Sequence, residues 1–224
     1  MNPALRASAA HVFVDNLDSV SVSADDAHHL FRVLRLRDGE RVTVSDGRGS
    51  WQSCTVVDAG LRSVGEVVVE PAGTQLTIAA AIPKGDRLEW MVQKLTELGV
   101  SEIVLLNCER SVVRWKDDRA PKHLARLARV AREAAAQSRR VWLPHLAGPV
   151  DVATAAGRPG AVVADPDGVA GTALADRPSV VLIGPEGGFT EAERRLCGRS
   201  VGLGRNILRV ETAALYAAVL FGDG

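Results

Sequence analysis

The chain has 224 residues, with 27 Lys and Arg against 27 Asp and Glu, so its formal net charge is zero. It is long enough for two small domains, it lacks the run of about eighteen apolar residues that a membrane helix needs, and its start lacks the order of a signal peptide. We therefore expect a soluble, cytoplasmic protein. The three widely spaced cysteines, Cys54, Cys108 and Cys197, form no C-x-x-C pair, which argues against a metal site and favours buried free thiols.

Residues 1–73 have the pattern of a small β domain. They carry seven Lys and Arg against ten Asp and Glu, a local charge of −3. Valine recurs at alternating positions in short runs that Asp and Gly separate, as is typical of strands. These runs are "HVFVD", "SVSVS", "ERVTVSDG", "SWQSCTVVD" and "VGEVVVE".

One helix is expected within this β domain, in the stretch "DDAHHLFRVLRLRDG" at residues 25–39. Asp25 and Asp26 are candidate N-caps, and a single apolar stripe is expected from Leu30, Val33 and Leu34. The same stretch places histidines and arginines on a short helix, where contact with RNA is an alternative to a purely structural role. The residues that could make this contact are His29, Arg32 and Arg35, with His28 and Arg37 beside them. The pattern suits a small, partly open β-barrel with one helix across an end.

The sequence pattern changes after "PAGTQ", residues 71–75, and we place a domain boundary between residues 73 and 74. From there strands alternate with helices, which predicts an α/β domain with a mainly parallel, buried sheet. Strands are predicted at 76–82, 102–107, 161–165 and 179–184, and helices at 87–99, 121–140, 190–198 and 211–220.

Basic residues concentrate in the middle of this second domain. Between Arg110 and Arg140 there are ten basic residues and three acidic ones, an excess suited to phosphate contacts. Arg126, Arg129 and Arg132 recur at three-residue spacing and are expected on one helix face, from which guanidinium groups can bind phosphates. A solvated helix face is the alternative.

The stretch "VLIGPEGGFTEAE", residues 181–193, joins a strand to a helix through three glycines. Thr190 and Glu193 form a capping box, so the helix is expected to begin there. Ligands of open α/β sheets bind beyond the carboxyl ends of strands, which makes this loop a candidate site. The motif GxxxxGK[ST] is missing and Glu186 is negative, so a triphosphate is not the expected ligand. A tight turn without a ligand is the alternative.

The stretch "GLGRNILRVETAALYAAVL", residues 202–220, has the same order of glycines, apolar run and helix. Thr212 is a plausible cap. Two such loops at one sheet edge can form two walls of one pocket. A surface salt bridge between Arg209 and Glu211 is the alternative interpretation of the two charges that flank Val210.

These motifs, in this order, resemble the RsmE family of small-subunit ribosomal RNA uridine-N3 methyltransferases, in the SPOUT superfamily. The matching pieces are "HHLFRVLRLRDGE", "KGDRLEWMVQKLTELGV", "ERSVV", "REAAAQSRR", "LIGPEGGFTEAE" and "LGRNILRVETAAL". The resemblance implies a PUA-like N-terminal barrel that binds RNA, an α/β domain with a C-terminal trefoil knot, and a homodimer. It also implies S-adenosylmethionine as methyl donor and small-subunit rRNA, or the assembled subunit, as partner.

The resemblance also assigns residues. It implies a cofactor site formed by Leu182, Gly184, Glu186, Gly187, Gly188, Leu203, Ile207, Leu208 and Arg209. The usual Thr of the family's "ILRTETA" is Val210 here, which weakens any role for a hydroxyl at that position. For N3 methylation, Arg209 is the first candidate to stabilise the deprotonated uridine. Glu211 could orient Arg209 or accept the proton, with Arg110 and Gln137 as further candidates. A SPOUT enzyme acting on another RNA site, or a non-catalytic RNA-binding module, is the alternative.

Overall fold

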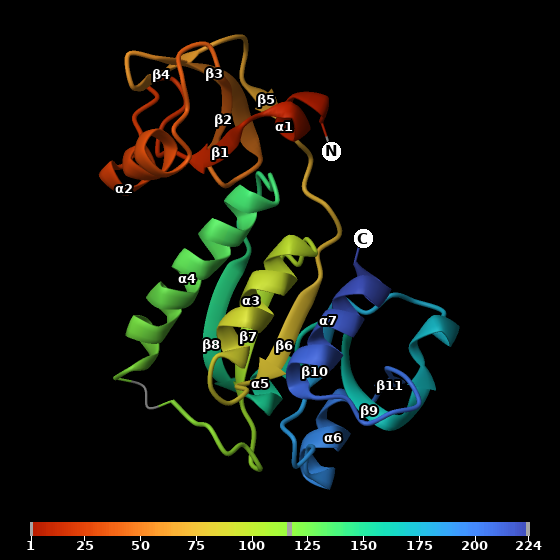
Figure 1. Ribbon diagram of the computed structural model, residues 1–224. Helices are drawn as coiled ribbons and strands as arrows, with labels where there is room; N and C mark the ends of the chain where they lie inside the picture. The colour runs from red at the N-terminus through yellow and green to blue at the C-terminus, as the bar shows by residue number, and fades with distance from the viewer. Residues whose placement is uncertain (1, 116–117, 223–224) are drawn as a thin grey trace. The chain divides into compact units, whose positions relative to one another are not determined.

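The computed structural model describes residues 2–115 and 118–222, and the chain divides into two compact units. The first unit comprises residues 1–72 with 132–143, and the second comprises 73–131 with 144–224. The predicted boundary at residue 73 therefore lies close to the first change of unit, while the end of the long helix and the segment after it return to the first. Figure 1 shows the course of the chain.

The first unit is built on a five-stranded sheet in which β1, β2, β3 and β4 are neighbours and β5 pairs with β3. Strand β1 runs parallel to β2, and the remaining pairs are antiparallel. Leu30, Val42, Val44 and Cys54 are fully buried in its core. Its elements are α1 (Pro3–Ala7), β1 (Ala10–Phe13), α2 (Ala24–His28), the π-helical turn η1 (His29–Val33), β2 (Arg41–Ser45), β3 (Ser50–Val57), β4 (Gly60–Ser63) and β5 (Val68–Val69).

The strand expected at residues 19–23 does not form. Instead the Ser23 hydroxyl accepts a hydrogen bond from Asp26 N at 3.0 Å and caps α2, so Ser23 is the N-cap rather than Asp25 or Asp26. The preference of serine for a cap overrides the valine alternation, because the segment has no partner strand. Val20 and Val22 pack against the core from this loop.

The predicted apolar stripe of this helix is also wrong. Leu30 is fully buried, but Val33 is 58% and Leu34 is 43% exposed. The chain passes from α2 into a π-helical turn, in which Leu34 N donates to His29 O at 2.9 Å. A wider turn moves residues three and four positions apart off a common face, so the spacing of an α-helix no longer applies.

The second unit is a six-stranded parallel sheet in the order β11-β9-β10-β6-β7-β8. Its elements are β6 (Thr77–Ala81), α3 (Arg87–Glu97), β7 (Glu102–Asn107), α4 (Ala120–Gln137), β8 (His145–Asp151), α5 (Val152–Ala156), β9 (Ala161–Ala170), the 3-10 helix η2 (Gly171–Ala173), β10 (Val180–Ile183), α6 (Glu191–Cys197), β11 (Ser200–Gly202) and α7 (Val210–Phe221). The predicted α/β alternation is confirmed, while β8, α5 and β11 are additional.

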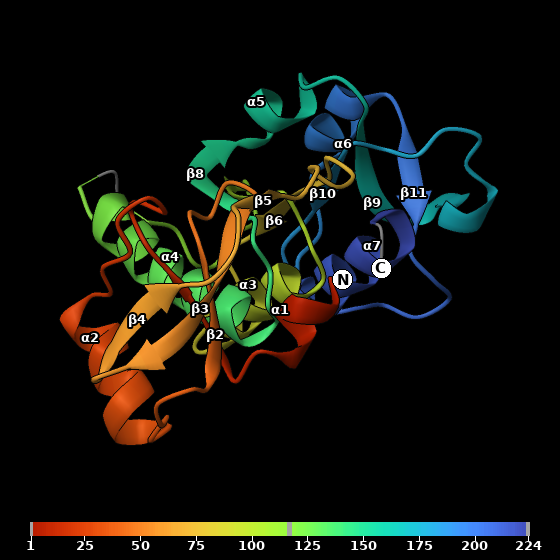
Figure 2. The same ribbon diagram turned by 90° about the horizontal axis from the view of Figure 1, so that it is seen from above.

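Helices cover both faces of this sheet, as Figure 2 shows. Alternate residues of β6 divide between two cores: Ile78 and Ala80 pack with residues of α3, α4 and α7, whereas Ala79 and Ala81 pack with residues of α5 and Phe189. This division follows from the two-residue period of a strand, and it explains why the strands are apolar at nearly every position.

The cysteines and the helices of the described residues have some further features. Cys54 and Cys108 are buried and free, and Cys197 is free but partly exposed. Across residues 2–115 and 118–222, no helix is long and apolar enough to span a bilayer, and no three or more His, Cys, Asp or Glu side chains gather where they could hold a metal ion.

Candidate active site

A cavity of about 480 Å³ lies in the second unit, beyond the carboxyl end of β10 and beside the middle of β9. The loop after β10 and the segment before α7 form two of its walls, as the sequence predicts, and the middle of β9 forms a third. Its volume falls in the usual range for a small-molecule site. It is lined by Arg110, Ala164, Asp165, Pro166, Ile183, Gly184, Pro185, Glu186, Gly187, Gly188, Phe189, Arg194, Leu203, Gly204, Asn206, Ile207, Leu208, Arg209, Val210 and Ala213.

The first loop is held by the predicted capping box, which is confirmed. Thr190 accepts a hydrogen bond from Glu193 N at 3.2 Å, and the Glu193 carboxylate accepts one from Thr190 N at 2.8 Å. The other oxygen of Glu193 accepts a hydrogen bond from Glu109 N at 2.8 Å. One buried carboxylate therefore fixes both the end of the glycine loop and the segment after β7 that carries Arg110.

Two glycines of this loop lie against their neighbours. A Cβ at Gly184 would stand 2.9 Å from the Phe189 ring, closer than carbon atoms approach each other without displacement. Arg110 Nη1 donates to the carbonyl oxygen of Gly187 at 3.2 Å. The loop thus needs a small residue at Gly184 and receives one side chain from the segment after β7.

The resemblance assigned nine residues to the cofactor site, and eight of them line this cavity. Leu182 does not, because it is fully buried inside the core on the α5 side of the sheet. The side chain of a central strand points into one of the two cores, whereas a residue just beyond the strand end faces the cavity.

The wall formed by the middle of β9 is not among the residues expected from the sequence. There the Arg194 Nη1 atom lies 3.1 Å from Asp165 Oδ2, and both side chains line the cavity. Burial alone would raise the pKa of Asp165, but hydrogen bonds from Asp167 N and Arg194, together with the charge of Arg194, hold it below its usual value. The rule that ligands bind at carboxyl strand ends could have identified Asp165, which closes the run "AVVAD".

The proposed catalytic residues occupy different environments. Arg209 is the N-cap of α7, with φ −69° and ψ 158°, and it lines the cavity. Thr212, expected as the cap, lies instead in the first turn of the helix. Glu211 is buried and its Oε1 atom lies 3.6 Å from Arg87 Nε, so its ion pair is with Arg87 rather than Arg209. Its Oε2 atom is buried without a hydrogen-bond partner among the described residues.

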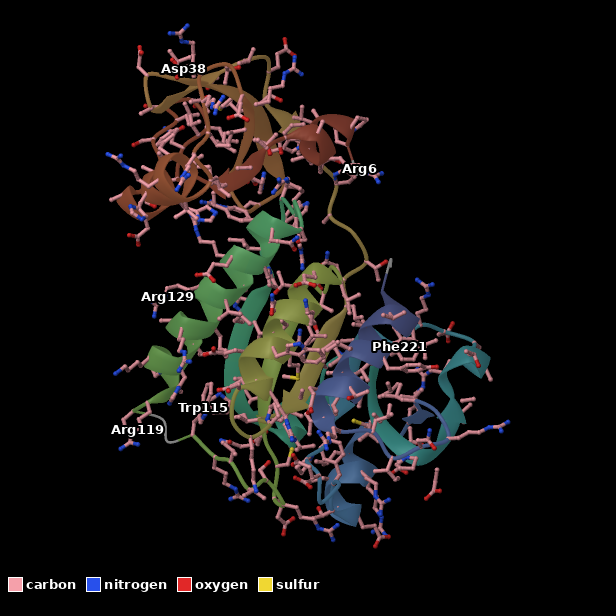
Figure 3. The ribbon with its side chains drawn as sticks, viewed as in Figure 1. Arg6, Asp38, Trp115, Arg119, Arg129 and Phe221 are labelled. Atoms are coloured by element: carbon pink, nitrogen blue, oxygen red, sulfur yellow. The ribbon has the colours of Figure 1, made fainter. Side chains whose placement is uncertain are left out.

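The predicted RNA contacts of α4 do not form one free face. Arg126 pairs with Glu89 of α3, and Arg132 donates to Phe13 O at 2.7 Å within the first unit. Arg129 is exposed and points away from the helix (Figure 3). Gln137 ends the helix and belongs to the first unit, outside the lining of the cavity.

In the first unit the predicted RNA contacts remain exposed. His29 begins the π-helical turn, Arg32 lies within it, and Arg35 follows it with a positive φ of 56°. The turn therefore presents all three side chains to solvent.

Comparisons with known proteins agree with this arrangement. A family model described as an RNA methyltransferase domain matches residues 70–222, and one described as an RNA methyltransferase PUA domain matches residues 22–64. The chain is 30% identical over 233 residues to the ribosomal RNA small subunit methyltransferase E of Bacillus subtilis (strain 168), covering 91% of this chain and 90% of that protein. It is 32% identical over 223 residues to the protein of the same name from Synechocystis sp., covering 89% and 71%.

Among solved structures, the ribosomal RNA small subunit methyltransferase E from Neisseria gonorrhoeae, bound to S-adenosyl methionine, is similar throughout. Its TM-score is 0.80 at 27% sequence identity, covering 96% of this chain and 98% of that one. The fold is thus an α/β methyltransferase fold with a PUA-like N-terminal domain. The chain belongs to the RNA methyltransferase family, and within it to the ribosomal RNA small subunit methyltransferase E family, RsmE.

Proposed function

We propose that this enzyme transfers a methyl group from S-adenosylmethionine to N3 of a uridine in small-subunit (16S) ribosomal RNA. The observation that carries the proposal is the cavity between the two glycine-containing loops at the carboxyl edge of the sheet, in a chain of the RsmE family. The Neisseria gonorrhoeae relative, whose structure contains S-adenosyl methionine, supports the choice of cofactor.

The residues of the cavity fit this cofactor. S-adenosylmethionine supplies a methyl group on a sulfonium cation and carries an adenine and an amino-acid end. The loop at Gly184–Gly188 offers backbone donors and acceptors at close range, and Phe189, Leu203 and Ile207 offer apolar surface for a purine. The carboxylates of Glu186 and Asp165 suit a positively charged ligand better than a phosphate.

Arg209 is the proposed catalytic residue. Uridine N3 carries a proton at neutral pH, so the reaction requires stabilisation of the anion that remains when the proton leaves. A guanidinium fixed near O2 or O4 favours that anion, as preorganised charge does in other active sites. Arg209 lines the cavity and is exposed, and Arg110, from the segment after β7, lines the same cavity.

Glu211 has a positioning role in this proposal. Its carboxylate faces Arg87 and is buried. This environment favours a role in holding the start of α7, and with it Arg209, rather than a role in direct proton transfer. The substrate base must leave its stack to enter a cavity of this kind, at a cost of a few kcal/mol.

Substitution of Arg209 tests the mechanism. We expect Arg209→Ala to bind S-adenosylmethionine in calorimetry, with kcat reduced by about 10²- to 10³-fold, the usual effect of removing one charge-stabilising donor. Arg205→Ala is the matched control, since Arg205 is exposed in the same loop but does not line the cavity. Near-normal methyl transfer by Arg209→Ala would remove this residue from the mechanism.

Locating the methyl group tests the substrate. Unmodified small subunits and naked 16S rRNA are incubated with labelled cofactor, and the methylated nucleotide is mapped by mass spectrometry. A methyl group on uridine N3 is the expected result. Methylation at a ribose hydroxyl or at guanine, or cofactor-independent RNA binding without transfer, would replace the proposal by one of its alternatives.

The proposal includes the remaining properties of the family. Residues 1–73 would form the PUA-like barrel that contacts RNA, and residues 74–224 would contain the trefoil knot and the dimer interface. Exposed apolar side chains of α7 support a homodimer, since Tyr216 is 46% and Val219 is 58% exposed on one side of the helix. We also expect the enzyme to work in the cytoplasm, on rRNA or the assembled subunit.

A further inference from the structure

A second cavity in the same unit has no role in the mechanism above. It has a volume of about 310 Å³ and lies between α3, the first half of α4 and the segments that follow β6 and β7. We call it the Trp115 cavity. Its lining residues are Ile82, Pro83, Gly85, Asp86, Leu88, Glu89, Val113, Trp115, His123, Arg126 and Leu127.

An aromatic stack forms part of its wall. The rings of Trp115 and His123 lie 4.4 Å apart between centroids and are inclined by 21°, so they are stacked. Trp115 is only partly buried, and Leu88 and Leu127 supply apolar surface beneath. Stacked rings with open space beside them can accept one further flat ring.

The charges in the lining of this cavity suit a neutral base, because the carboxylates of Asp86 and Glu89 stand against the single guanidinium of Arg126. Arg126 is held by Glu89, which fixes its guanidinium at the wall. Beyond the cavity, Arg119, directly before α4, and Arg129, within it, are exposed and point away from the protein in Figure 3. Guanidinium groups exposed in this way can bind the phosphates of an RNA backbone.

The two cavities open at the same edge of the sheet. Strands β6 and β10 are parallel neighbours with Ala80 opposite Ile183, so Ile82 and Gly184 both lie beyond carboxyl ends. The segment after β7 also reaches both, because Arg110 lines the cofactor cavity and Trp115 lines the other. An RNA strand whose target base enters the first cavity can therefore extend to the second.

We propose that the Trp115 cavity binds one unstacked base of single-stranded RNA, a neighbour of the base to be methylated. The base stacks on the Trp115–His123 pair, while the exposed Arg119 and Arg129 contact the RNA backbone. Aromatic stacking of this kind tolerates every base, so the site contributes affinity and register rather than sequence selection. The inference rests on the RNA substrate of the proposed function, but not on the identity of the methylated atom.

Two substitutions of similar size separate stacking from packing. Trp115→Phe keeps an aromatic ring, whereas Trp115→Leu keeps apolar bulk without one. Affinity is measured by fluorescence anisotropy with a labelled, unmodified single-stranded RNA taken from around the target uridine. We expect Trp115→Leu to weaken binding from about 5-fold to about 150-fold, the range given by 1–3 kcal/mol per stacked base. Trp115→Phe should keep most of the wild-type affinity for RNA. The affinity for S-adenosylmethionine should stay unchanged in both variants.

A scan with abasic nucleotides supplies the second readout. Removing one base near the target should weaken binding to the wild type but not to Trp115→Leu, because the partner of that base is already missing. Equal affinities for the Phe and Leu variants, or additive losses at every abasic position, would overturn the proposal. If the RNA is bound in this Trp115-dependent way but never methylated, the proposed function fails while this inference stands.

Discussion

Glu193 shows how a single side chain can organise a site. Its carboxylate accepts hydrogen bonds from the backbone of Thr190 and from that of Glu109, a residue distant in sequence, and the residue is 9% exposed. Hydrogen bonds to an ionised acceptor are stronger than those between neutral groups, and a buried donor left unpaired is costly. Glu193 thereby joins the glycine loop to the segment that carries Arg110 and Trp115.

We expect Glu193→Ala to lower the free energy of unfolding by about 1–3 kcal/mol, because two backbone donors lose their acceptor. It should also weaken S-adenosylmethionine binding, since both walls of the cavity loosen. Urea denaturation and calorimetry measure the two effects.

Glu191→Ala is the control in the same helix. Glu191 pairs with Arg195 on the surface, where such pairs contribute about 0–1 kcal/mol. Equal losses of stability in the two variants would show that the hydrogen bonds of Glu193 contribute no more than a surface ion pair does.

At the scale of elements, a polar network joins the amino ends of three neighbouring strands, at the edge opposite the cavities. Glu102 begins β7 and accepts hydrogen bonds from Thr77 of β6 and from Arg158, and His145 of β8 lies 3.1 Å from its other oxygen. Burial alone would raise the pKa of Glu102, but these hydrogen bonds and the charge of Arg158 lower it below its ordinary value of 4.5.

This network predicts a pH-dependent contribution to stability. A carboxylate whose pKa is lower in the folded state stabilises the fold above pH 4.5, and the contribution is lost as the pH falls through the folded pKa. We therefore expect Glu102→Gln to be less stable than the wild type near neutral pH, with the difference shrinking below pH 4.5.

Urea denaturation at several pH values measures that difference. Glu97→Gln, which removes a pair with Lys94 on α3, should change stability by less than about 1 kcal/mol. A difference between Glu102→Gln and wild type that stays constant at every pH would contradict the assigned role of the carboxylate.

At the scale of the whole molecule, each unit has a hydrophobic core of its own. Leu30 is fully buried in the first unit, whereas Leu95 is fully buried in the second. The cofactor cavity is lined by the second unit alone. A defect in one core should therefore affect the two binding functions unequally.

We expect Leu30→Ala to cost about 2–5 kcal/mol of stability, the usual result of creating a cavity in a core. It should weaken rRNA binding but leave S-adenosylmethionine affinity close to that of the wild type. Thermal unfolding, filter binding with rRNA and calorimetry measure these effects.

Leu95→Ala provides the comparison. A similar loss of volume in the second core should lower cofactor affinity as well as stability. If both variants lost cofactor binding to the same extent, the two units would not be separable in function.

The alternation of strands and helices, the capping box at Thr190 and two walls of the proposed cofactor cavity could be predicted from the amino-acid sequence alone. These features depend on local patterns: apolar runs that bury both faces of a strand, and a cap whose donors and acceptors are three residues apart. The family resemblance added the cofactor and the reaction, which no periodicity could supply.

Other features depend on contacts between segments that are distant in sequence. The edge strand β8 contains Gly148 and Pro149, and its sequence lacks the alternation of a strand. Its extended conformation therefore depends on its pairing with β7. The partners of Glu211, Arg126 and Arg132 come from other elements, and spacing along one helix cannot reveal them. The Trp115 cavity likewise exists because segments after two different strands meet α3 and α4, which is a property of the packed chain and not of any single stretch of it.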